Sequence, residues 1–216
     1  MHLYVDLDFF MKARACSIWE DTLLLFGESD FFAVDSFQHS ARNHAKKIEK
    51  KGFSSLATVY EQGADYLANN AKEIKRTGEF DSIMEQLSGI ENIDPGEALL
   101  LAAAMLDDSA YILCTGDKRF IKALEALKAA NMPLAQSIKG KILHFEQLLY
   151  ALMNRLPADE FAKKVTAKCA QDCDNVVKIA FHQGFTREGA LAALESYRAN
   201  FFNEFCIPYE EIDSWR

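Results

Sequence analysis

The sequence predicts an α/β fold with a central parallel sheet and a helical C-terminal extension. As far as about residue 155, short apolar runs of strand length alternate with longer helical patterns, and this alternation is typical of a parallel sheet. From Pro157 onwards the pattern is that of helices alone. We therefore divide the chain into a sheet domain over residues 1–152 and a helical extension over residues 153–216.

The individual elements follow from the spacing of the apolar residues. Strands are expected over residues 2–6, 31–34, 111–114 and 142–144. A helical stretch is expected after the first strand, as far as about residue 26, and further helices are expected over residues 36–51, 54–76, 80–87, 95–106, 118–130 and 145–155. In the extension, two long helices over residues 158–183 and 186–202 are expected to meet at Gly184.

Composition and charge narrow the class of protein. Half of the 216 residues are apolar and only four are proline, which indicates a folded chain. The formal charge of −8 argues against a protein that coats nucleic acid indiscriminately, because phosphate binding depends on Lys and Arg. The negative charge does not exclude a nuclease, because an acidic metal site would account for part of the excess of acidic residues.

The sequence also predicts a cytoplasmic protein. No apolar run approaches the roughly 20 residues of a membrane span, and the first residues lack the basic segment of a signal peptide. The five cysteines form no CxxC pair, which favours reduced thiols. Cys169 and Cys173 could share a metal with His182, but they fall on an apolar stripe, and a role in the core is favoured.

Acidic residues gather where the predicted strands end. Asp6 and Asp8 follow the first strand, Asp117 follows the third, and Glu97 lies at the start of an apolar helix. In a parallel sheet the carboxyl ends of neighbouring strands converge on one crevice. Carboxylates gathered there repel one another unless a hard cation is present, and Mg²⁺ or Mn²⁺ prefers oxygen ligands.

Most of these carboxylates also have a local explanation. Asp8 and Asp117 could each cap the helix that follows, and Asp94 with Glu97 forms a capping-box pattern. Asp6 is expected to precede its helix by two residues, so a capping role suits it poorly. A metal site is favoured because these carboxylates occur together where predicted strands end or helices begin.

At these residues the chain resembles the PIN-domain nucleases. The resemblance is carried by Asp6, by Gly96-Glu97 before an Ala/Leu-rich helix, and by the segment from Ile112 to Phe120, which contains Thr115-Gly116-Asp117. The segment from Gly140 to Leu143 resembles the closing strand of that family. The resemblance covers roughly residues 1–152 and implies a PIN-like three-layer fold and a ribonuclease that depends on Mg²⁺ or Mn²⁺.

The resemblance also implies roles for the site residues. Asp6, Glu97 and Asp117 would bind the metal, and Thr115 would orient Asp117 or a water molecule. The second acid of the family has no direct match: Asp35 lies at about the right place, Asp8 lies near Asp6, and Glu61 is a more distant substitute. Its identity stays open.

For the substrate, basic residues near the acids are the natural candidates. Lys118 and Arg119 directly follow Asp117, and Arg42 and Lys46 lie four residues apart on one predicted helix. Contact with the RNA backbone and an ordinary solvated helix surface are both open for these residues. Many members of the family are bacterial toxins, so the resemblance extends to RNA as substrate and to an antitoxin or a second copy of the chain as partner.

Two other functions remain as alternatives. The Asp6-Leu7-Asp8 spacing is that of a haloacid-dehalogenase-like phosphatase, although Phe9-Phe10 replaces the small residues usual after that motif. The other is a regulatory or interaction protein built on a PIN-like fold that has lost catalysis. The unmatched second acid favours it, and the aromatic residues of the C-terminal helices would then form a partner surface.

Overall fold

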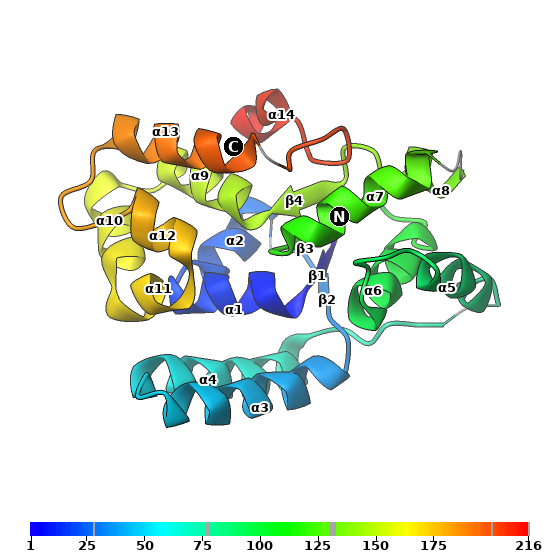
Figure 1. The fold of residues 1–216 in the computed structure, drawn as a ribbon, viewed down its shortest axis with the longest axis horizontal. Coiled ribbons are helices and arrows are strands. Elements are labelled where there is room, and N and C mark those ends of the chain that lie inside the picture. Colours follow the sequence, from blue (N-terminus) through cyan, green and yellow to red (C-terminus); the bar gives the residue numbers. More distant parts are fainter. Residues whose placement is uncertain (28, 77, 130–132, 200, 216) are drawn as a thin grey trace.

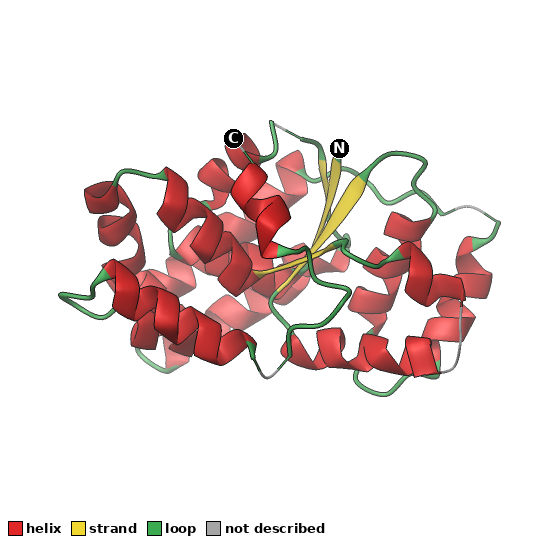
Figure 2. Ribbon diagram, turned by 90° about the horizontal axis from the view of Figure 1, so that it is seen from above, coloured by secondary structure: helices red, strands yellow, loops and turns green. Residues whose placement is uncertain are grey.

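The computed structural model describes residues 1–27, 29–76, 78–129, 133–199 and 201–215. Within these residues the chain forms a four-stranded, all-parallel sheet with helices on both sides (Figures 1 and 2). The strands are β1 (His2–Val5), β2 (Phe31–Phe32), β3 (Tyr111–Thr115) and β4 (Ile142–His144). Their order across the sheet is β2-β1-β3-β4, so the predicted α/β fold with a parallel sheet is confirmed.

The register brings the carboxyl ends of three strands to one edge. Val5 of β1 is aligned with Cys114 of β3, and Thr115 of β3 with His144 of β4. The backbone amide of Asp6 donates a 2.9 Å hydrogen bond to the carbonyl of Cys114 and so continues the β1–β3 pairing. The residues that follow β1 and β3 are therefore neighbours in space.

Helices fill the connections between the strands, and another directly follows β4. They are α1 (Leu7–Ala15), α2 (Trp19–Leu25), α3 (Ser36–Lys50), α4 (Ser54–Asn70), α5 (Phe80–Ser88), α6 (Pro95–Met105), α7 (Lys118–Ala129), α8 (Pro133–Ser137) and α9 (Phe145–Arg155). The C-terminal helices are α10 (Ala158–Thr166), α11 (Lys168–Cys173), α12 (Asn175–Ala180), α13 (Arg187–Arg198) and α14 (Tyr209–Ser214). The expected end of α7 at Ala130 lies outside the described residues.

The expectation of one helical stretch between the first strand and residue 26 is wrong, because the helix is interrupted at Ser17. This residue adopts a left-handed conformation with φ 54°. Its amide donates to the carbonyl of Arg14, and the amide of Ile18 donates to that of Ala13. These two bonds satisfy carbonyls that the end of α1 would otherwise leave free, and α2 starts in a new direction.

The helix expected over residues 54–76 also ends early, at Asn70. Beyond it the chain runs alongside β2, where the amide of Lys72 donates a 2.9 Å hydrogen bond to the carbonyl of Phe31. The backbone groups of a short edge strand need partners. This sheet contact therefore outweighs the helical propensity of the sequence.

The helices of the C-terminal region differ in their bounds from those predicted. The helix expected over residues 158–183 is divided into α10, α11 and α12, and Asp174 caps the last of these. After α13 the chain returns to the sheet, where the amide of Ile142 donates to the carbonyl of Phe205 and the amide of Ile207 donates to that of Ile142. The tail thus covers the outer edge of β4.

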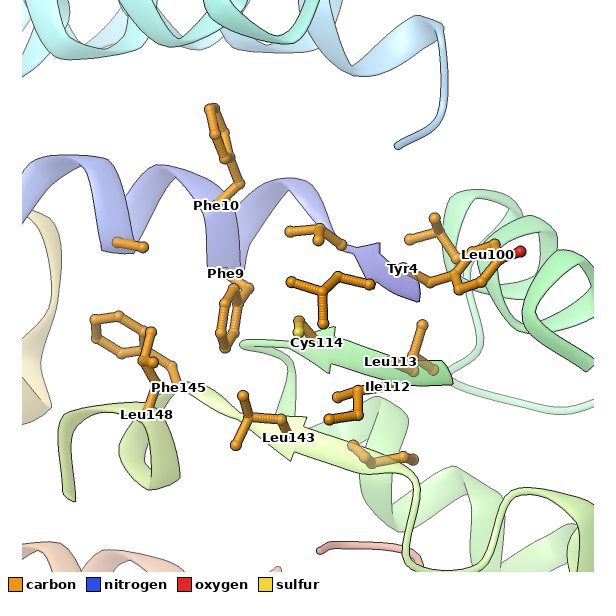
Figure 3. Close-up of a cluster of buried hydrophobic side chains, with 14 of the residues drawn as sticks. Tyr4, Phe9, Phe10, Leu100, Ile112, Leu113, Cys114, Leu143, Phe145 and Leu148 are labelled. Carbon is orange, nitrogen blue, oxygen red and sulfur yellow. The ribbon is translucent and has the colours of Figure 1, made fainter. Parts of the chain in front are cut away.

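Large apolar side chains fill the space between the sheet and the helices (Figure 3). Phe9 and Phe10 of α1 are fully buried and point to opposite sides. Phe9 packs edge-on against Phe145 of α9, with ring centroids 6.0 Å apart, and Phe10 packs against Trp19 at 4.9 Å. Burying one such ring contributes about 1.5–3 kcal/mol. Apolar residues of α10 to α13 belong to the same buried cluster.

The described helices include none that combines the length and the apolar character needed to cross a membrane.

Candidate active site

A cavity of about 580 Å³ opens at the carboxyl ends of β1 and β3. One part of its wall is acidic and is formed by Asp6, Asp8, Asp94, Glu97 and Asp117. The other part is formed mainly by side chains of α1, α3 and α4, namely Met11, Phe37, Ser40, His44 and Tyr60. The fold therefore brings together acids that are more than a hundred residues apart in the sequence, as the strand-end argument predicts.

Asp6 lies between β1 and α1. It occupies the N-cap position of α1, contrary to the expectation that it precedes the helix by two residues, but its side chain makes no capping hydrogen bond. Burial, followed by the nearby charge of Asp8, raises the pKa of Asp6 to about 7. The carboxyl group is thus poised to lose its proton when a cation approaches.

Glu97 lies in the first turn of α6 and is only 5% exposed. Its carboxylate accepts a 2.9 Å hydrogen bond from the amide of Asp94, and the Asp94 carboxylate accepts a 2.8 Å bond from the amide of Glu97. This reciprocal pair is the predicted capping box, with Asp94 as N-cap. Burial outweighs the Asp94 amide bond and, together with the charges of Asp94, Asp6 and Asp117, raises the pKa of Glu97 to about 8.

Asp117 caps α7 and is paired with Arg119. Its Oδ1 accepts a 2.7 Å hydrogen bond from the Arg119 amide, and its Oδ2 accepts a 2.9 Å bond from the guanidinium. Burial opposes ionisation here, but the bonds from Arg119 hold the pKa of Asp117 below its usual value. Thr115 Oγ1 accepts a 3.0 Å bond from the Asp117 amide, so Thr115 positions the backbone of this turn.

Gly116 allows the turn after β3 to approach α1 closely. A Cβ atom at this position would lie 2.3 Å from Oδ2 of Asp8 and 3.3 Å from Nζ of Lys12. No side chain fits in that space without displacing the Asp8 carboxylate. The presence of glycine at this position of the Thr-Gly-Asp segment is therefore explained by steric constraints.

The residues proposed for the second family acid lie in different places. Asp8 lines the cavity, but it lies inside α1 instead of capping it, and it forms a 2.7 Å ion pair with Lys12. Asp35 is exposed and lines separate surface hollows beside Glu73. Glu61 is exposed on α4 and is not among the residues that line the cavity. Of the three, only Asp8 is at the site.

The two basic residues after Asp117 that were predicted to contact the substrate lie in different places. Arg119 lines the cavity. Lys118 instead pairs with Glu146 at 2.6 Å, and its ammonium lies over the rings of Tyr197 and Phe201.

The two basic residues predicted on α3 do not line the cavity. Arg42 pairs with Asp65 of α4 at 2.8 Å, and Lys46 is exposed. Helical spacing puts both on the side opposite His44 and Ser40, which do line the cavity.

The sequence argument missed three groups at or near the site. His44 and Tyr60 form an edge-on aromatic pair with ring centroids 6.2 Å apart on the cavity wall. Lys12 carries a recognisable signal, because it lies four residues after Asp8 on one helix. The two aromatic residues carry no such signal, since only the packing of α3 and α4 brings them to the strand ends.

The carboxylates fit a hard divalent cation in type but are not arranged as ligands. Within the described ranges, no three His, Cys, Asp or Glu side chains are grouped closely enough to hold a metal ion. Glu97 is engaged in its capping box, Asp117 with Arg119 and Asp8 with Lys12. The oxygen-only donor set and the raised pKa values of Asp6 and Glu97 still fit Mg²⁺ or Mn²⁺. Binding of a metal ion through Asp117 would require the guanidinium of Arg119 to move away from the carboxylate.

The chain matches no family model, and no curated protein or solved structure was found to be similar to it. The chemistry of the cavity is therefore the basis for assigning a function.

Proposed function

We propose that this protein is a metal-dependent nuclease of PIN-like fold that hydrolyses phosphodiester bonds, in RNA by preference. The observation that carries the proposal is the convergence of Asp6, Glu97 and Asp117 on one cavity at the carboxyl ends of β1 and β3. Burial and mutual repulsion oppose the ionisation of Asp6 and Glu97. A divalent cation would relieve that repulsion.

Each residue has a defined part in this proposal. Asp6, Glu97 and Asp117 supply the oxygen ligands, and Thr115 keeps the Asp117 turn in place through the 3.0 Å bond to its amide. A divalent cation held by these carboxylates would supply the activation of a water molecule and the stabilisation of the leaving oxygen of the phosphodiester. Arg119, once released from Asp117, lies on the same wall and binds a phosphate oxygen of the substrate.

The remaining wall of the cavity suits a nucleotide. His44 and Tyr60 offer aromatic surface, and Ser40 offers a hydroxyl group. Bases stack on such rings with about 1–3 kcal/mol each. The choice of RNA over DNA rests on the resemblance of the sequence to the PIN-domain nucleases.

A phosphatase is less well supported. That mechanism needs Asp6 as an ionised nucleophile and Asp8 as a free acid or base. Asp8 is held by Lys12 at 2.7 Å and is therefore not a free acid or base. Trapping with beryllium fluoride separates the two proposals, because only the phosphatase would form an adduct on Asp6.

A second candidate is a PIN-like binding protein without catalysis. It is favoured by the ion pairs that occupy Asp117 and Asp8 and by the lack of a three-ligand group among the described residues. Such a protein would bind nucleic acid without cleaving it and would not depend on Mn²⁺.

The test is cleavage of a single-stranded RNA by the wild type and by Asp6→Asn, with Mn²⁺ and with EDTA. Asp81→Asn is the matched control, because Asp81 is exposed on α5 away from the cavity. We expect cleavage by the wild type and the control with Mn²⁺ alone, and none by Asp6→Asn. Equal cleavage by all three proteins would contradict the site, and binding without cleavage would favour the second candidate.

A further inference from the structure

One side of α3 continues from the wall of the cavity toward the turn that joins α3 to α4. Ser40 and His44 line the cavity. Helical spacing puts Lys47 and Lys51 on the same side, because each follows one of these two residues after two helical turns. Lys51 is the C-cap residue and keeps a near-helical backbone, with φ −87° and ψ 0°. The two lysines therefore extend the cavity wall along α3.

The helical hairpin of α3 and α4 gives this side its direction. The hairpin runs alongside α1, and its turn lies away from the sheet (Figure 1). The helix α4 packs against α1 and α11, and α3 packs against α4. From the rise of a helix, Lys51 lies about 17 Å along the axis from Ser40. A strand of nucleic acid that leaves the cavity along this side would pass both ammonium groups.

The two lysines are free to bind an anion. Both are exposed, and the ion pairs among the described residues involve neither of them. Lys12, Lys118 and Lys164, by contrast, each lie within 2.6–2.8 Å of a carboxylate oxygen. Like charges four residues apart on a helix repel each other. An anion bound between Lys47 and Lys51 would relieve that repulsion.

The local charge differs from that of the whole chain. Residues 36–53 contain five basic residues and one acid, whereas the formal charge of the chain is −8. The dipole of α3 favours basic residues near its C-terminal end, but it does not select a side of the helix. Arg42, on the side away from the cavity, is neutralised by Asp65. The free charges of Lys47 and Lys51 lie on the side that leads to the cavity.

We infer that Lys47 and Lys51 bind phosphate groups of a single-stranded RNA outside the cavity, so that the side of α3 from Ser40 to Lys51 guides the strand. The inference rests on the proposed function and adds to it the path of the substrate beyond the cavity. RNA fits this surface better than an acidic peptide does, because the path begins beside the aromatic pair of His44 and Tyr60, on which a base can stack.

The experiment compares two double variants, Lys47→Gln/Lys51→Gln and the matched control Lys46→Gln/Lys50→Gln. Both remove the same charge from the same helix, and glutamine has a helix propensity close to that of lysine. Lys46 and Lys50 are also exposed, but helical spacing turns them away from His44. The affinity for a fluorescent single-stranded RNA of about 12 nucleotides is measured by anisotropy in EDTA, at several salt concentrations.

We expect Lys47→Gln/Lys51→Gln to weaken binding of this RNA at least about tenfold, and the control to weaken it by less than about threefold. The slope of log K against log salt concentration should fall by about 0.7 for each of the two lysines, as it does for each lost phosphate contact to a single strand. A dinucleotide, which fills only the cavity, should bind equally to all three proteins.

An equal loss in the two double variants would overturn the inference, because net charge alone would then explain it. Wild-type protein that binds the long RNA no more tightly than the dinucleotide would also overturn it, and so would polyglutamate that competes as well as RNA of the same length. These results would leave the cleavage of RNA with Mn²⁺, and hence the proposed function, intact. The expected binding pattern without any cleavage would contradict the nuclease but support the path along α3.

Discussion

The carboxylate of Asp117 is enclosed by Arg119, which donates to it from its backbone amide and twice from its guanidinium. The amide bond caps α7 and can stay in place when a ligand binds, because it uses Oδ1. The guanidinium, by contrast, would compete directly with the proposed metal ion for the same oxygens. Arg119 therefore keeps the carboxylate of Asp117 ionised, but its guanidinium also occupies the oxygens that would bind a ligand.

Removing the guanidinium should separate metal binding from phosphate binding. In Arg119→Gln, Asp117 loses its competitor, so we expect Mn²⁺ to bind several-fold more tightly in calorimetry. RNA cleavage should nevertheless fall by about tenfold or more, because the charged contact to the phosphate is lost. Arg42→Gln is the control, since Arg42 pairs with Asp65 outside the cavity, and it should change neither quantity. Weaker Mn²⁺ binding in Arg119→Gln would contradict the competition.

The stability of the metal-free protein should fall as the pH rises. The folded-state pKa values of Asp6 and Glu97, about 7 and about 8, lie above their usual values, so the native state holds protons that the unfolded chain has already released. The stabilisation from these two protonated groups is on the order of a few kcal/mol. It is complete below about pH 4 and is lost progressively as the pH rises to about 8. Melting temperatures measured against pH in EDTA test this.

Glu97→Gln gives the control for that pH dependence. Glutamine can keep the capping box with Asp94, but it does not titrate. The variant should melt higher than the wild type near pH 8 in EDTA and should gain no stability from Mn²⁺. A pH profile unchanged from that of the wild type would show that Glu97 is ionised in the folded protein.

Gly116→Ala should damage the site through a steric effect. The new Cβ atom would lie 2.3 Å from Oδ2 of Asp8, so Asp8 must move away from Lys12, at a cost of about 1–3 kcal/mol in unfolding free energy. Gly89→Ala is the control, because an added Cβ there meets no atom within 4 Å. Denaturant unfolding measures both. The cost should shrink when Gly116→Ala is combined with Asp8→Ala, and an equal cost in that background would exclude Asp8 as the obstacle.

Glu146→Gln tests the buried charge beside the sheet edge. Burial lowers the pKa of His144 and keeps its ring neutral. The Nδ1–H group of His144 therefore donates a 3.0 Å hydrogen bond to the carboxylate of Glu146, and Lys118 supplies the balancing positive charge. Burial opposes ionisation of Glu146, but these two partners hold its pKa well below its usual value. Stability from this group is present above about pH 4.5 and is lost as the pH falls below it.

The substitution should therefore cost about 3–5 kcal/mol at neutral pH, because Lys118 loses its buried partner. The cost should be smaller near pH 3, because the unfolded wild type is then protonated at this carboxyl group, whereas the folded form stays ionised until the pH falls to about 2. Urea unfolding at both pH values measures it. A cost that does not change with pH would mean that the lost interaction is not the ionic one.

Local sequence patterns predicted the elements whose signals are local. The capping box of Asp94 and Glu97 is an example, because its two bonds join residues three positions apart. The break at Ser17 was missed, since a serine is rarely left-handed and only the bonds to Arg14 and Ala13 compensate. The early end of α4 was missed because it depends on a contact with β2, which lies far away in the sequence.

The same distinction applies to the site. Asp6 and Asp117 were predicted together because parallel strands bring their carboxyl ends to one edge whatever the details of packing. Asp35 was misplaced, because β2 ends two residues earlier than expected and the side chain of Asp35 lines separate surface hollows. The ion pair of Asp174 with Lys12 could not be predicted, because it depends on the packing of α11 beside α1, which are far apart in the sequence.

The return of the chain to β4 after α13 has a consequence for how copies of this protein behave toward one another. Backbone groups of Phe205 and Ile207 occupy the positions beside Ile142 that a strand from another molecule would use. On the opposite side of the sheet, Lys72 pairs with Phe31 in the same way. Uncovered sheet edges recruit foreign strands and begin aggregation. A chain shortened before Glu204 would thus expose an open edge for strand pairing, and its colloidal solubility should fall.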